Sequence, residues 1–128
     1  MSYAPHANKL LFILRAGNMQ STSDQPFSKI GNFANFMITG ITAMRVTGAT
    51  SVLCLGGVYS GAAKSGNTLV SNLQSWLGLS GPGKIVQATL ANSATTDAQT
   101  ATPIFSLSTG STAACTADVY IHGVPLDS

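Results

Sequence analysis

The chain has 128 residues, 58 of which are alanine, serine, threonine or glycine, while only ten carry a charge and none is glutamate. One domain with a sizeable core is expected at this length. A hydrophobic content of 45% excludes a disordered chain, and 8% charge, far below the usual ~25%, leaves a surface of hydroxyls, amides and methyls.

The first 29 residues differ in pattern from the rest. A short apolar run, residues 10–14, lies between Lys9 and Arg15 and is followed by a polar stretch. This pattern predicts one buried strand, or an arm, and then a loop. We therefore divide the single domain into 1–29, an N-terminal arm and first strand, and 30–128, a β-sandwich. No signal peptide is indicated.

Turn signals recur at regular intervals from residue 27 onward. The apolar residues at 33, 36, 38, 41 and 43 predict the beginning of a strand pair with a bend at Thr39–Gly40. Residues 52–59 are expected to form the most apolar strand, and Gly56–Gly57 inside it indicates a bulge or a close backbone approach. The next turn is expected at residues 64–67, where Gly66 and Asn67 tolerate a positive φ.

Residues 69–77 allow two interpretations. Their apolar residues follow a helical spacing, so a helix of two turns competes here with a strand. The members of this stripe are Leu69, Val70, Leu73, Trp76 and Leu77. Flanking glycines and hydroxyl residues weaken the helix, and both interpretations stay open.

The second half of the chain is predicted to form strands and turns. Residues 80–83 (Ser-Gly-Pro-Gly) predict the strongest turn, and 86–90 alternate as a half-buried strand does. A loop is expected at 92–102, then a strand at 104–107 and a turn at 109–112. In the last strand, Ala117, Val119 and Ile121 are expected on one face.

The number and spacing of these elements predict the fold class. Seven or eight short strands, separated by turns every 8–12 residues, are typical of an all-β protein. We expect an antiparallel β-sandwich, jelly-roll-like, with about eight strands. A parallel sheet is not expected, because strands do not alternate with helices.

Residues 78–84 match the phosphate-binding pattern G-x-x-x-x-G-K. That loop needs a following Ser or Thr and a helix whose amides hold phosphate. Here Ile85 follows Lys84, and the next residues alternate like a strand. The match therefore predicts a tight turn, not a nucleotide site.

Acid–base chemistry has few candidates in this chain. Asp118, Tyr120 and His122 share one face of the last strand, but Asp118 and His122 are separated by about 13 Å of strand rise. We expect no enzyme, no metal site and no cofactor. These three side chains are instead expected on an outward polar face, with a contact face for a partner as the functional alternative.

Aromatic residues give a second set of interface candidates. Tyr59 and Trp76, as strand aromatics, are interpreted as core or interface anchors. With Tyr3 and Tyr120 they allow the alternative of a sugar-stacking platform. Cys54 and Cys115 are expected to be buried thiols, with one disulfide between two strands as the alternative.

Nucleic acid and membrane are not expected partners. The six basic residues are spread singly, whereas a nucleic-acid footprint needs a clustered basic face. Residues 46–63 carry no charge over 18 positions, but their glycines, hydroxyls and tyrosine favour strand and turn over a span.

In three stretches, the pattern of turns and strands resembles that of a known class of proteins. The stretches are residues 56–66, residues 79–90 and residues 117–123, which reads Ala-Asp-Val-Tyr-Ile-His-Gly. Over roughly residues 30–125 the chain is similar to small structural proteins of tailed-phage virions, of the capsid decoration or cement type. This resemblance implies a small β-sandwich, often trimeric, that clamps neighbouring capsid subunits and has no catalytic residues.

Three functions remain as hypotheses. The first is a virion structural protein whose partners are the major capsid protein, other virion subunits and copies of itself in a homotrimer. It would reside in the virion, assembled in the host cytoplasm. The second is a receptor- or carbohydrate-binding β-domain of a phage fibre or spike, and the third is a cellular β-sandwich binding module.

Overall fold

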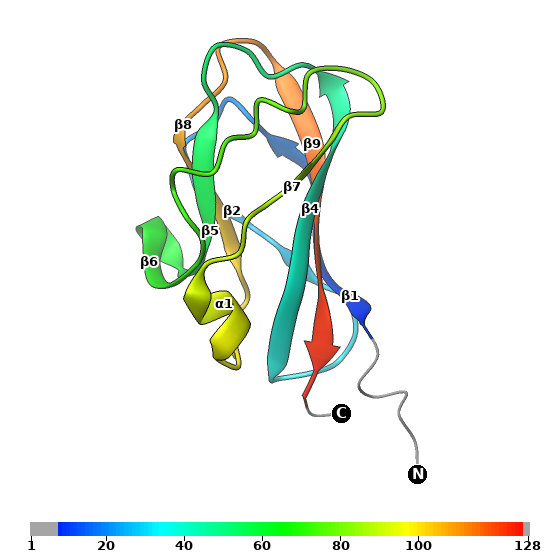
Figure 1. The fold of residues 1–128 in the computed structure, drawn as a ribbon, viewed down its shortest axis with the longest axis vertical. Coiled ribbons are helices and arrows are strands. Elements are labelled where there is room, and N and C mark those ends of the chain that lie inside the picture. Colours follow the sequence, from blue (N-terminus) through cyan, green and yellow to red (C-terminus); the bar gives the residue numbers. More distant parts are fainter. Residues whose placement is uncertain (1–7, 127–128) are drawn as a thin grey trace.

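The computed structural model describes residues 8–126, and two antiparallel sheets packed face to face form the molecule (Figure 1). The five-stranded sheet has the order β3-β1-β9-β4-β7, and the four-stranded sheet has the order β2-β8-β5-β6. The predicted all-β antiparallel sandwich is confirmed. Tyr3, His6 and Asp127 lie outside the described residues.

The strands have these bounds: β1 Lys9–Asn18, β2 Gln25–Pro26, β3 Ser28–Lys29, β4 Phe36–Gly48, β5 Leu55–Gly61, β6 Ser65–Val70, β7 Ile85–Gln87, β8 Ile104–Thr109 and β9 Cys115–Pro125. Two short helices complete the fold: a 3-10 turn, η2, at Ala62–Lys64 and one α-helix, α1, at Asn92–Thr96.

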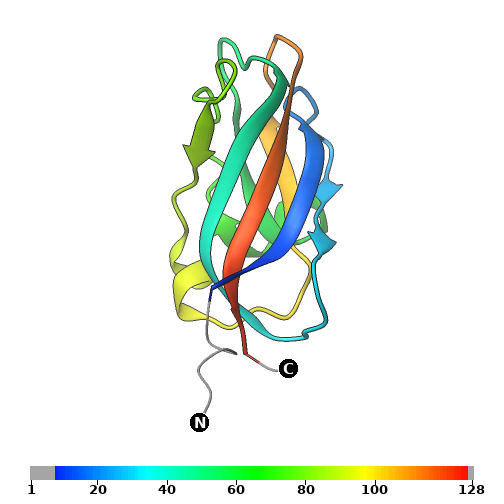
Figure 2. The ribbon, with the colours of Figure 1, turned by 90° about the vertical axis from the view of Figure 1, so that its right-hand side faces the viewer.

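Three long strands dominate the larger sheet, with β9 between β1 and β4 (Figure 2). The predicted alternation of β9 is confirmed, since Ala117, Val119 and Ile121 are fully or almost fully buried between the sheets. The apolar run of 10–14 belongs to β1, which pairs with β9 along most of its length. Of the two expectations for this run, the strand is the one observed.

The prediction of a strand pair around Thr39–Gly40 was wrong, because β4 passes through these residues. It is one strand of 13 residues that runs through this point. The register against β9 shifts between Ile38 and Gly40, so the extra residue is absorbed by a bulge. The glycine therefore marks an irregularity inside the strand and not a reversal of the chain.

The strand predicted at 52–59 begins later than expected, at Leu55. Val52 lies in the preceding loop, 78% exposed and with a φ of +65°. The close approach predicted at Gly56–Gly57 is confirmed. A Cβ on Gly57 would lie 2.1 Å from the Val70 carbonyl oxygen, and one on Gly56 would lie 2.3 Å from the Leu107 Cα.

In the middle of the chain, the structure decides between the two interpretations left open for residues 69–77 and corrects the loop predicted at 92–102. Residues 69–77 contain no helix: β6 ends at Val70, a turn follows, and Ser75 forms an isolated bridge with Leu55. Leu73, which the helical stripe would bury, is 74% exposed. Conversely, the loop expected at 92–102 holds α1. Tertiary pairing with neighbouring strands overrode the local spacing in the first case.

The turn predicted at 64–67 lies slightly earlier, because Ser65 already starts β6. Gly66 has the expected positive φ of +74°, but Ala63 and Lys64 also adopt positive φ values, of 56° and 60°. The other predicted turns are present: Lys84 N donates to Gly81 O at 3.2 Å, and residues 110–114 connect β8 to β9.

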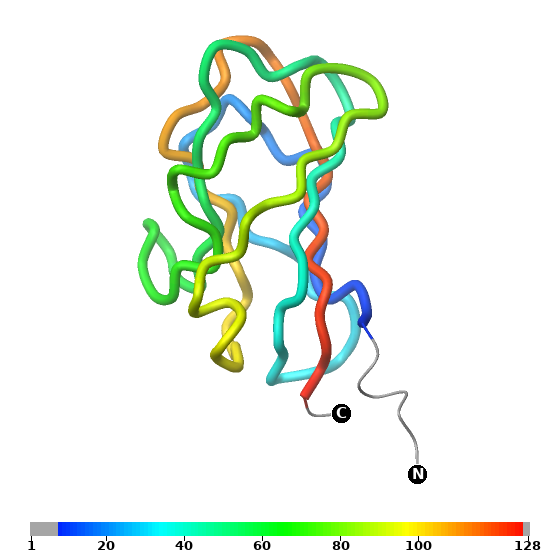
Figure 3. Tube along the Cα trace, in the orientation of Figure 1, coloured from blue at the N-terminus to red at the C-terminus, as the bar shows by residue number. Residues whose placement is uncertain are grey.

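One continuous core fills the space between the sheets. At one end, the rings of Phe12, Phe33 and Phe36 contact one another edge to face. Farther along, Trp76 packs in the same manner on Phe105. The chain trace in Figure 3 shows residues 71–91 crossing from the smaller sheet to the larger one and back, and this crossing segment carries Trp76 into the core.

Candidate functional site

The outer face of the five-stranded sheet carries three of the sequence-predicted residues. Asp118, Tyr120 and His122 alternate with the buried residues of β9 and face away from the core, as expected. Asp118 Oδ1 accepts a hydrogen bond from Ala16 N at 2.8 Å, and the Tyr120 hydroxyl donates to Asp118 Oδ2 at 3.4 Å. Burial and the neighbouring Asp118 raise the pKa of Tyr120.

Apolar side chains border this group on β4 and β7. Met44 lies opposite Asp118 in the ladder, and Ile85 lies opposite Met44. Met44 is 40% exposed and Ile85 is 52% exposed. We call Met44, Ile85, Asp118, Tyr120 and His122 the outer β9 face. It combines apolar contact area with few charges, which is typical of the centre of a protein interface.

Trp76 does not belong to any surface. Its side chain is fully buried, and its Nε1 donates to Gly56 O at 3.0 Å. A side chain in this position anchors the core and contacts no partner from outside the fold. A stacking platform built on its ring is therefore absent from the structure.

Tyr59 lies on the outer face of the four-stranded sheet. Val58 points into the core, and Tyr59, the next residue of β5, points the opposite way. Its side chain is nevertheless only 4% exposed, and this burial raises the pKa of its hydroxyl. Tyr59 lines a cavity of about 290 Å³ together with polar residues that sequence reasoning did not select: Lys64, Thr68, Ser71 and Asn72.

A charged network adjoins this cavity. Lys64 Nζ donates to Ser106 Oγ at 3.0 Å, and Ser106 Oγ donates to Asp24 Oδ1 at 2.9 Å. The other Asp24 oxygen, Oδ2, accepts from Ala63 N at 2.8 Å. These hydrogen bonds, together with the Lys64 charge, hold the pKa of Asp24 below its usual value. No motif revealed this network, because its members come from three distant segments.

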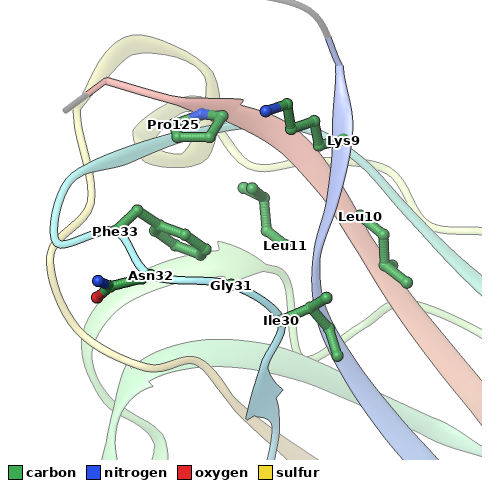
Figure 4. A pocket seen from close by; sticks show the side chains of 8 residues that line it. All are labelled: Lys9, Leu10, Leu11, Ile30, Gly31, Asn32, Phe33 and Pro125. Carbon is green, nitrogen blue, oxygen red and sulfur yellow. The ribbon is translucent and has the colours of Figure 1, made fainter. Parts of the chain in front are cut away.

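A smaller, apolar hollow lies where β1 begins (Figure 4). Its volume is about 160 Å³, and its lining includes Leu10, Leu11, Ile30 and Phe33. Lys29 Nζ donates to the Phe33 carbonyl at 2.6 Å and lies 4.9 Å from the centre of the Phe33 ring. The hollow is suited to apolar contacts, because most of its lining is hydrocarbon.

Residues 78–84 form no phosphate-binding loop, because Lys84 leads directly into β7 and not into a helix. Cys54 and Cys115 are both buried and free, in agreement with the first expectation for them, and no disulfide joins them. Burial raises the pKa of Cys54 to about 11, so its thiol is unreactive at neutral pH.

Metal ligands do not gather within residues 8–126: three or more His, Cys, Asp or Glu side chains never come together there. In the same part of the chain, the helices are too short or too polar to cross a membrane.

Comparisons with known protein families, with curated proteins and with solved structures gave no match. The functional assignment is therefore based on the residues of this chain itself.

Proposed function

We propose that the chain is a non-enzymatic virion structural protein, a capsid decoration or cement subunit that stabilises neighbouring capsid proteins. The observation that supports this proposal is the outer β9 face. It presents Met44, Ile85 and Tyr120 around a single carboxylate, on the long strands β4 and β9 and the short edge strand β7. Such a surface loses little hydration energy when a partner covers it, because it carries few charges.

Repetition strengthens contacts of this kind. In a symmetric shell each copy buries a modest patch, and many copies together give a strong attachment. We propose the homotrimer as the unit that presents the outer β9 face to the major capsid protein. The virion is the corresponding location.

Light scattering of the purified chain is the first test. We expect a trimer or a larger closed assembly that cosediments with capsids of the same virus. Ile85→Lys places a charge in the outer β9 face and should abolish assembly or capsid attachment. Leu73→Lys is the matched control, since Leu73 is also an exposed apolar residue but lies outside this face. A monomer that fails to attach to capsids would contradict the proposal.

The alternative, a carbohydrate-binding β-domain of a fibre or spike, has one observation in its favour. This is the polar cavity at Tyr59, on the sheet opposite the outer β9 face. Glycan binding that persists in a chain without affinity for capsids would favour this alternative.

A further inference from the structure

The cavity on the smaller sheet is built around a buried tyrosine whose hydroxyl has no partner. Thr68 of β6 lies directly opposite Tyr59 in the β5–β6 ladder, so both side chains share the outer face. No hydrogen bond joins the Tyr59 hydroxyl to residues 8–126, although every fully buried side-chain oxygen and nitrogen there has a partner. The hydroxyl therefore reaches the open space of the cavity.

The remaining lining supplies further free hydrogen-bonding groups. Ser71 Oγ accepts from Leu73 N at 3.1 Å, which leaves its own hydrogen available. The side chains of Thr68 and Asn72 likewise form no hydrogen bond within the described chain. Together with Tyr59 they present three hydroxyls and one amide to the same volume of about 290 Å³. Groups that both donate and accept in this way match the hydroxyls of a sugar ring.

Lys64 adds one positive charge to this lining. Its ammonium has three hydrogens and gives one to Ser106 Oγ, so two remain for a ligand. None of the residues that line the cavity is acidic, and Asp24, which interacts with the Lys64 charge, lies behind Ser106. The remaining donors of Lys64 therefore suit a carboxylate on the ligand.

The position of Lys64 is held by the backbone on both sides. Ala63 and Lys64 adopt consecutive positive φ values, which cost energy in residues other than glycine. Asp24 stabilises this conformation by accepting from Ala63 N and from Ser106 Oγ. A cation held in this manner loses little freedom when a ligand binds.

From these contacts we infer that the cavity binds a hydroxylated carboxylate of the sugar-acid class, with the carboxylate on Lys64 and the ring hydroxyls on Tyr59, Thr68, Ser71 and Asn72. The ring of Tyr59 is too buried for a sugar to stack on it, so its hydroxyl is the group that contacts the ligand. The site lies on the sheet opposite the outer β9 face and is independent of capsid attachment.

Titration of the ¹⁵N-labelled full chain with D-glucuronate, followed by two-dimensional NMR, tests the inference. We expect shifts confined to the amides of residues 59–72, with a Kd of about 1 mM, the affinity that a ligand of this size reaches. D-Glucose and acetate serve as the neutral sugar and the bare carboxylate, and each should bind at least tenfold more weakly. Equal binding of either one, or no shifts with glucuronate, would overturn the inference.

Two substitutions locate the site. Tyr59→Phe removes only the hydroxyl and should weaken glucuronate binding about fivefold, as the loss of one hydrogen bond does. Lys64→Gln should weaken it about tenfold, because a charge-assisted contact is lost. Lys84→Gln is the matched control and should bind like the unaltered chain. Unchanged binding by both site variants, with melting curves that show them folded, would assign the ligand elsewhere and overturn the inference.

Discussion

At the scale of single residues, Trp76 shows how one side chain joins the two layers. It comes from the segment that crosses between the sheets, packs edge to face on Phe105 of β8, and donates its indole hydrogen to Gly56 O on β5. Its backbone also pairs with the 50–54 loop, through Trp76 N to Cys54 O at 2.8 Å. Trp76 therefore fixes the position of a segment that has little regular structure of its own.

Replacing this ring tests its role in stability. Trp76→Phe leaves a cavity in the core and removes the donor to Gly56 O, so we expect a loss of about 3 kcal/mol in the free energy of unfolding. Urea unfolding followed by circular dichroism measures it. Leu73→Ala, at an exposed position nearby, should change stability by less than about 0.5 kcal/mol. Similar values for the two variants would show that the ring does not hold the layers together.

At the scale of elements, Asp24 ties the β5–β6 connection to the rest of the smaller sheet. It precedes β2, yet its carboxylate accepts hydrogen bonds from η2 and from β8. The connection contains Ala63 and Lys64 in the left-handed region, where side chains are strained. Hydrogen bonds to a carboxylate are stronger while it is ionised, so they compensate for this strain best in the ionised state.

The pH dependence of stability follows from this arrangement. Because the folded state lowers the pKa of Asp24 below 3.8, its contribution is complete above the unfolded-state value and is lost as the pH falls through the folded-state value. Asp24→Asn should therefore lower the melting temperature at pH 7, and the difference from the unaltered chain should shrink on acidification below about pH 4. Asp97→Asn is the control. A difference that stays constant down to pH 2 would contradict the prediction.

At the scale of the whole molecule, the last strand lies in the middle of the larger sheet. β9 pairs with β1 on one side and β4 on the other, so the first and last strands of the sequence are neighbours (Figure 2). Without β9, no strand joins β1 to β4, and the core between the sheets is exposed to solvent. Pairings of such large sequence separation also make folding slow, in milliseconds to seconds.

Truncation tests this dependence. A fragment of residues 1–110 lacks β9, so we expect it to show no cooperative thermal transition. Adding a synthetic peptide of residues 111–128 should restore the β-sheet circular dichroism spectrum and a transition whose midpoint rises with peptide concentration. A peptide of the same composition in scrambled order is the control. Cooperative unfolding of the fragment alone would show that the sandwich is complete without its central strand.

Some features of the candidate site could be predicted from the sequence, and others could not. The outward positions of Asp118, Tyr120 and His122 follow from the alternation of β9 and were predicted. The exposure of Met44 and Ile85 beside them depends on the β4–β9 and β4–β7 registers, which no local pattern specifies. The cavity at Tyr59 was missed, because its lining combines β5, β6 and the turns on either side of β6.

The amino-acid sequence alone determined the fold class, the inward face of β9 and the places where glycine is required, such as Gly57. The first two depend on the side-chain period of two within each strand, while Gly57 is a local signal of a close approach whose cause is Val70 on the neighbouring strand. Only the tertiary structure decided the strand order, the non-helical path of residues 69–77 and the burial of Tyr59. Each of these depends on which distant strand lies alongside, and that choice is made by the packing of the whole core and not by any local stretch of the chain.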